Sequence, residues 1–164
     1  MPVTRRSFML SGAAALAACG PVANGSQIDA QVRASRDQLY AQYPQFQSLA
    51  DRSAGVLIIP EIVKGGLIVG AAYGEGALLV GDAVVDYISV AAGSLGFQAG
   101  VQTFGQALFF VSPEALAAFR RADGWQLGVD AEATVLEDGV AASVTTNTVN
   151  QPIYELVYGQ RGLL

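Results

Sequence analysis

The stretch KGGLIVGAAYGEGALLVG, residues 64–81, is rich in glycine and otherwise almost entirely apolar. It does not fit a phosphate-binding loop of the Walker type, because that loop ends in Gly-Lys-Ser/Thr and here Lys64 precedes the glycines. It does not fit a dinucleotide fingerprint either, because Gly74 and Gly76 are followed by an apolar run typical of a strand rather than by a helix. A membrane span needs ~20 apolar residues, and Glu75 interrupts this run after about ten.

The stretch instead predicts two strands of an antiparallel meander. Gly74 and Gly76 would form the turn around Glu75. Gly66 and Gly70 would leave one face of the sheet without side chains at these positions, so that a backbone, a side chain or an acyl group could approach it.

Apolar runs continue on both sides of this stretch, from residue 56 to residue 111, with no room for helices between them. This spacing favours an antiparallel meander over βαβ units. The first run, GVLIIP, is expected to end at Pro60, and EIVKGG is expected to connect it to the next strand. Asp138-Gly139 predicts a hairpin turn, and QRG, residues 160–162, predicts a turn into another strand.

Three helices are expected around the sheet. Ser26 is a predicted N-cap for a helix over residues 27–42, and Pro44 would start a second, shorter helix. Ser112 and Pro113 are typical of a third helix start, which interrupts the strands. The sequence therefore predicts an α+β fold: N-terminal helices and one inserted helix packed on a strongly curved, barrel-like antiparallel β-sheet.

The N-terminus has the features of an export signal. Arg5 and Arg6 precede a short apolar segment, which resembles a twin-arginine signal and is too short to span a membrane. Leu16-Ala17-Ala18-Cys19 resembles a bacterial lipobox, in which Cys19 is lipidated and becomes the new N-terminus; an incidental free cysteine is the alternative. We therefore predict a signal peptide over residues 1–18, a lipidated tether over 19–27, and a domain over 28–164.

Charge and composition exclude several classes of function. The chain has a formal net charge of −5, with 9 basic and 14 acidic residues, and removal of residues 1–18 takes away two arginines, giving −7. Nucleic acid is therefore not an expected partner. With no histidine and one cysteine, the chain cannot form a Cys/His zinc site, a His-based triad or a disulfide framework.

Other catalytic signals are also weak. Asp82 and Asp86 are close in sequence but are typical of solvated acids at strand ends, and Ser94 does not lie in a nucleophile elbow. We expect no enzyme activity, no metal and no cofactor. An enzyme acting on lipid esters is the least favoured of the three function classes considered.

Several motifs follow one another between about Ala50 and Leu164: Pro60…Lys64-x-Gly66, Tyr73-Gly74-x-Gly76, Tyr87, Gly96-x-Gln98-x-Gly100 and Phe119…Gly124-Trp125…Gly128. In order and spacing they resemble the SYLF domain family. The resemblance implies a lipid-binding module, with phosphoinositide binding in eukaryotic members and phospholipid binding proposed for bacterial ones. The family pattern continues past the final GLL with a further strand, so the resemblance implies a domain that lacks its last strand and has an unpaired sheet edge.

Two candidate sites for lipid headgroups follow. The first is Lys64, the only lysine, in a predicted turn beside strands, because an ammonium group suits a phosphate. The second combines Arg120 and Arg121 in the last turn of the inserted helix with Trp125. Ordinary surface charge and a packed tryptophan are the alternatives.

The predicted function is non-enzymatic binding of anionic phospholipid headgroups by a lipoprotein of the bacterial cell envelope, anchored through Cys19. It would face the periplasm, and Gly20 after the cysteine favours the outer membrane. A structural or protein-interaction lipoprotein of the envelope is the alternative.

Overall fold

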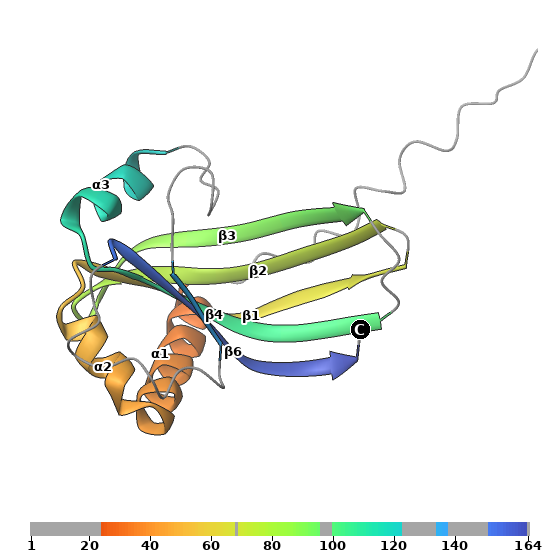
Figure 1. Cartoon of the computed structure of the whole chain (residues 1–164), viewed down its shortest axis with the longest axis horizontal. Helices are drawn as coiled ribbons and strands as arrows, with labels where there is room; N and C mark the ends of the chain where they lie inside the picture. Colours follow the sequence, from red (N-terminus) through yellow and green to blue (C-terminus); the bar gives the residue numbers. More distant parts are fainter. Residues whose placement is uncertain (1–23, 68, 96–99, 123–133, 138–150, 164) are drawn as a thin grey trace, which may run out of the picture.

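The computed structural model describes residues 24–67, 69–95, 100–122, 134–137 and 151–163, and these form an α+β fold (Figure 1). Two helices come first, five antiparallel strands form most of the sheet, and a third helix is inserted between two of the strands. The helices are α1 (Gly25–Gln42), α2 (Pro44–Asp51) and α3 (Pro113–Arg121). The strands are β1 (Gly55–Gly66), β2 (Val69–Val80), β3 (Ala83–Leu95), β4 (Gly100–Phe110), β5 (Thr134–Glu137) and β6 (Ile153–Leu163).

The sheet has the strand order β3-β2-β1-β4-β6-β5. Neighbouring strands from β3 to β6 are antiparallel, whereas the short β5 pairs with β6 in parallel. In the described part of the chain β3 and β5 are the two edges, and no pairing joins them. The expectation of a barrel-like sheet is therefore not supported, and the α+β class is confirmed.

The helix starts follow local capping chemistry. Ser112 caps α3 as predicted, because its Oγ accepts a hydrogen bond from the backbone N–H of Ala115 at 3.3 Å, and Pro113 follows. The predicted cap of α1 at Ser26 is wrong. Asn24 accepts from the N–H of Gln27 at 3.0 Å, and the Gln27 side chain accepts from the N–H of Asn24, which forms a capping box two residues earlier.

The first strands are longer than predicted. β1 continues through Pro60, which lies at a β-bulge where the register shifts against both neighbouring strands. A bulge tolerates proline because no ladder hydrogen bond needs its missing N–H. EIVKGG is consequently the second half of β1, not a connection.

The predicted turn at Gly74 and Gly76 is also wrong, because β2 runs through both residues. These glycines lie beside the β1 bulge. A Cβ atom on Gly74 would lie 2.7 Å from the carbonyl oxygen of Glu61, and one on Gly76 would collide with that of Ile58. Glycine is needed here for a close approach of two backbones rather than for a turn.

The predicted turn at QRG is a second bulge. β6 continues to Leu163, and its register against β4 shifts where Gly159 and Gln160 lie opposite Phe104. Gly159 has φ +63° and Gly162 has φ +109°, both in the region that favours glycine. The strand therefore bends without reversing.

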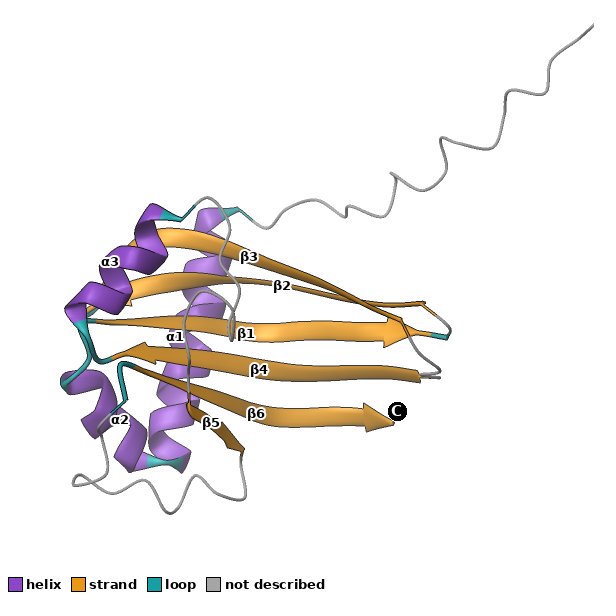
Figure 2. Ribbon diagram, turned by 45° about the horizontal axis from the view of Figure 1, so that its top comes forward, coloured by secondary structure: helices purple, strands orange, loops and turns teal. Residues whose placement is uncertain are grey.

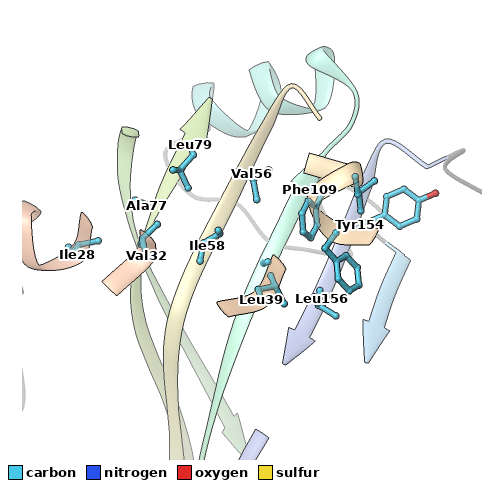
Figure 3. Close-up of a cluster of buried hydrophobic side chains, with 13 residues drawn as sticks. Ile28, Val32, Leu39, Val56, Ile58, Ala77, Leu79, Phe109, Tyr154 and Leu156 are labelled. Carbon is cyan, nitrogen blue, oxygen red and sulfur yellow. The ribbon is translucent and has the colours of Figure 1, made fainter. Parts of the chain in front are cut away.

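The bulges separate two halves of the sheet. We call the half that contains the start of β1 the near half. There, residues 55–59 of β1 are buried on both faces of the sheet. One face, which we call the α1 face, packs against α1 and α2 through a cluster that includes Phe46, Phe109 and Leu156 (Figure 3). The opposite face, the α3 face, packs against α3 through Phe110, Leu116 and Phe119.

The other half extends beyond all three helices (Figure 2). We call it the far half of the sheet. It comprises residues 62–66 of β1, 69–74 of β2, 88–95 of β3, 100–105 of β4 and 158–163 of β6.

Candidate functional site

Large apolar side chains are exposed on the far half of the sheet. Val63, Val69, Tyr73 and Val101 have exposed fractions of 43%, 65%, 49% and 60%, and Leu67, directly after β1, reaches 68%. Residues that are paired across neighbouring strands share a face, and side chains alternate along each strand. Val63 lies opposite Tyr73, and Gly65 lies opposite Val101. All four strand residues therefore lie on the α1 face and form one patch.

The residues between these side chains are small. Gly65 and Ala71 lie opposite each other, and Ala71 lies opposite Gly93 on β3. Small residues leave the patch flat and shallow, without the long polar side chains that usually shield an exposed sheet. A contiguous exposed apolar patch on a folded domain often marks a surface that binds a partner or a membrane.

The far half also has an unusual charge. It contains no Asp or Glu, although the chain has 14 acidic residues, and it contains two cations, Lys64 and Arg161. Glu61 and Glu75 lie directly outside it. Its apolar surface is therefore associated with local positive charge on a chain whose net charge is negative.

The two cations lie on opposite faces. Lys64 is half-exposed, lies opposite Ala72 and Gln102, and follows Ile62 on the α3 face. Arg161 is exposed and lies opposite Thr103 on the α1 face, which is the face of the apolar patch. The two side chains therefore place positive charge on both sides of this end of the sheet.

The predicted second cluster lies elsewhere. Arg120 and Arg121 are exposed in the last turn of α3, as predicted. Leu116 of α3 packs near Gly55 at the start of β1, and Lys64 lies nine residues farther along that strand. At ~3.3 Å per residue the separation is on the order of 30 Å. The structure does not bring Lys64 together with these arginines, whose place at a helix C-terminus is favourable without any ligand.

The remaining predicted site residues, Trp125 and Cys19, lie outside the described residues. The signal peptide and most of the tether also lie outside them. Arg161 was missed by the sequence prediction because QRG was interpreted as a turn. The signal that could have identified it is the continuation of the strand through Gly159 to Leu163, which includes Arg161.

A cleft of about 210 Å³ lies where the α1 face meets α1. Its floor is the bulged part of the sheet, and α1 forms one wall. The hydroxyl groups of Ser35 on α1 and Tyr158 on β6 are hydrogen-bonded at 2.8 Å, and burial raises the pKa of Tyr158 to about 12. The lining residues are Ser35, Gln38, Leu39, Gln42, Pro60, Glu61, Thr103, Phe104, Gly105, Tyr158, Gly159 and Arg161.

The acids considered for catalysis have local partners. Asp82 forms an ion pair with Arg36 at 3.1 Å, and Asp86 accepts a hydrogen bond from the backbone N–H of Tyr87 at 2.9 Å. Within the described residues, no three potential metal ligands lie together.

Several residues of the SYLF-like motifs lie at structural positions. Pro60 occupies the bulge, Gly74 and Gly76 allow the close approach to β1, and Phe119 is buried against Phe110. The Tyr87 hydroxyl donates to Asp29 of α1 at 3.0 Å. The structure therefore accounts for these motif residues by their roles in the fold.

Comparison with known proteins adds no assignment: no protein-family model matches the chain, and no curated protein matches it by sequence. Among the described residues no helix is long and apolar enough to cross a membrane. The resemblance to the SYLF family therefore stays a prediction from the motifs.

Glu155 gives a testable pH dependence outside the candidate site. It is buried on the α3 face of β6 and accepts a hydrogen bond from Gln106, and burial raises the pKa of its carboxyl group. The folded chain thus binds this proton more tightly than the unfolded chain, so the ionised carboxylate destabilises the fold as pH rises.

We expect Glu155→Gln to raise the Tm at pH 7.5, because the amide keeps an acceptor for Gln106 without a charge. The difference from the parent should disappear below about pH 4, where both unfolded and folded carboxyl groups are protonated. Thermal unfolding followed by circular dichroism across this range checks the prediction. A Tm that falls equally at both pH values would contradict this prediction, because the loss would then be independent of the ionisation of the carboxyl group.

Proposed function

We propose that this chain is a non-enzymatic lipid-binding lipoprotein of the bacterial cell envelope, in which the far half of the sheet contacts anionic phospholipid headgroups. Acyl chains on Cys19 would hold the protein at the membrane, facing the periplasm, with Gly20 favouring the outer membrane. No cofactor or metal is part of the proposal.

One observation carries it: of the eight large apolar side chains that are exposed among the described residues, five lie on or directly beside the half of the sheet that has cations and no acids. Valine and tyrosine side chains can enter the headgroup region, while Lys64 and Arg161 can pair with phosphates. The rest of the chain is acidic and would be repelled by anionic lipids, which orients the far half toward the membrane.

A structural or protein-interaction lipoprotein is the second candidate. The open edge at β3 and the flat apolar patch would also suit a protein partner that adds a strand or packs on the sheet. The charge pattern favours the lipid, because a phospholipid surface supplies both the apolar region and the negative charge that this end of the sheet complements.

Vesicle flotation of the mature chain, residues 19–164, carrying Cys19→Ser tests the proposal without an acyl anchor or the signal peptide. We expect Val69→Ser with Val101→Ser to weaken binding to anionic vesicles about tenfold, because two exposed valines lose the apolar contact worth ~1.5 kcal/mol or more when fully buried. The matched control is Val80→Ser with Val85→Ser, in the near half, with exposed fractions of 40% and 38%. Equal retention of all three proteins on the vesicles would exclude the patch as the lipid contact.

A further inference from the structure

We propose that the cleft beside α1 binds a dipolar phosphoethanolamine headgroup, with its phosphate at Arg161 and its ammonium at Glu61. The inference rests on the proposed function, which it deepens by naming the class of lipid. It concerns one lipid molecule held in a defined site, beyond the general attraction of a membrane surface.

The cleft has charge of opposite sign at its two sides. Glu61 comes from the β1 bulge and Arg161 from β6, and both are exposed side chains lining the same cleft. β4 alone lies between these strands, so the two backbones are ~10 Å apart. Among the described residues neither side chain has an ion-pair partner, and they do not pair with each other.

A second carboxylate strengthens the negative side. Glu75 of β2 lies directly opposite Glu61 in the ladder, and both belong to the α1 face. Like charges in such a pair repel each other, so a cation placed between or beside them is favoured. Glu75 is held by the Tyr73 hydroxyl, which donates to its Oε1 at 2.8 Å.

These charges select the class of headgroup. A site with a carboxylate and a guanidinium suits a ligand that has an ammonium and a phosphate separated by two methylene groups, because each charge gains a charge-assisted hydrogen bond. A purely anionic headgroup or a free phosphate would gain the contact with Arg161 but would be repelled by Glu61. The neutral side chains of Gln38 and Thr103 can hydrogen-bond either part of the ligand.

The position of the cleft gives the acyl chains a path. Thr103 in the cleft lies opposite Val63, and Val101, two residues before Thr103 in β4, lies on the same face toward the far end of the sheet. A lipid with its headgroup in the cleft could therefore lay its chains along the apolar patch toward the far end of the sheet. The cleft and the apolar patch therefore form one continuous surface on the α1 face.

Titration of the mature chain (residues 19–164) carrying Cys19→Ser with O-phosphoethanolamine, inorganic phosphate and vesicles tests the inference. By calorimetry we expect O-phosphoethanolamine to bind at least tenfold more tightly than phosphate. Glu61→Gln should weaken the binding of O-phosphoethanolamine about tenfold without weakening the binding of phosphate. Arg161→Gln should weaken the binding of both ligands. The control variants carry the same charge changes at exposed positions of α3: Glu114→Gln and Arg120→Gln. They should change the affinity for neither ligand.

In vesicles, phosphatidylethanolamine should compete with the soluble headgroup for the cleft, and phosphatidylglycerol should not. Equal binding of phosphate and O-phosphoethanolamine, or an unaffected Glu61→Gln variant, would overturn the dipolar site. If vesicle flotation persists in that case, the proposed function stands and only this inference fails. If the headgroup binds the cleft while no vesicle is retained, the cleft is supported and the proposed membrane contact is wrong.

Discussion

Replacing Phe109 with alanine is expected to lower the free energy of unfolding by about 3–5 kcal/mol. The Phe109 ring is fully buried on the α1 face and stacks on Phe46 of α2, with ring centroids 5.7 Å apart and planes 21° apart. The substitution would leave a cavity at the point where β4 holds α2 to the sheet. Since a domain of this size has a total stability of ~5–15 kcal/mol, the variant should be largely unfolded in mild urea.

Equilibrium urea denaturation measures this loss, and two variants serve as controls. Phe109→Leu keeps most of the side-chain volume and should lower the free energy of unfolding by less than the alanine substitution does. Val101→Ala removes an exposed side chain of the far half and should change stability by less than about 0.5 kcal/mol. A Phe109→Ala variant as stable as Val101→Ala would show that α2 does not depend on this contact.

The helices could be predicted because their signals are local. Pro44, Ser112 and Pro113 act within one turn of the helix that they begin, and the structure confirms the starts that they indicate. Asn24 was missed in favour of Ser26, although both are good caps. The deciding signal is also local: Gln27, three residues after Asn24, completes a capping box with it.

The strands could be predicted in kind but not in length. Pro60, Gly74 and Gly76 were interpreted as ends of strands, yet they are neighbours at one bulge. Proline in β1 is tolerated because it lies at the bulge, and the glycines of β2 let the backbone around this bulge approach closely. That compensation connects residues more than ten positions apart. Only the pairing of the strands reveals it.

The candidate site was predicted in part. Lys64 was selected because it is the only lysine, and the structure places it in the acid-free far half. The exposure of Val69 and Val101 could not be predicted, because alternating valine, alanine and glycine are equally typical of a buried strand. It follows from the position of all three helices at one end of the sheet (Figure 1).

Reversing the two cations of the far half, Lys64→Glu with Arg161→Glu, is expected to weaken binding to anionic vesicles by a factor of ~30 or more. Each basic side chain near an anionic surface contributes about 1 kcal/mol, and a glutamate in its place adds repulsion. The loss should decrease as salt is raised, because these exposed charges are screened. Both residues are at least partly exposed, so the fold should be retained, which circular dichroism checks.

Flotation of this double variant beside Arg120→Glu with Arg121→Glu, both in the mature chain (residues 19–164) carrying Cys19→Ser, tests the central claim most directly. The two variants change the net charge equally, so any difference reports where the membrane contact lies. We predict that the parent and the α3 variant float with vesicles of phosphatidylglycerol and phosphatidylethanolamine, while the Lys64 and Arg161 variant stays in the dense fraction. Loss of flotation in the α3 variant alone, or equal flotation of all three proteins, would contradict a lipid contact at the far half of the sheet.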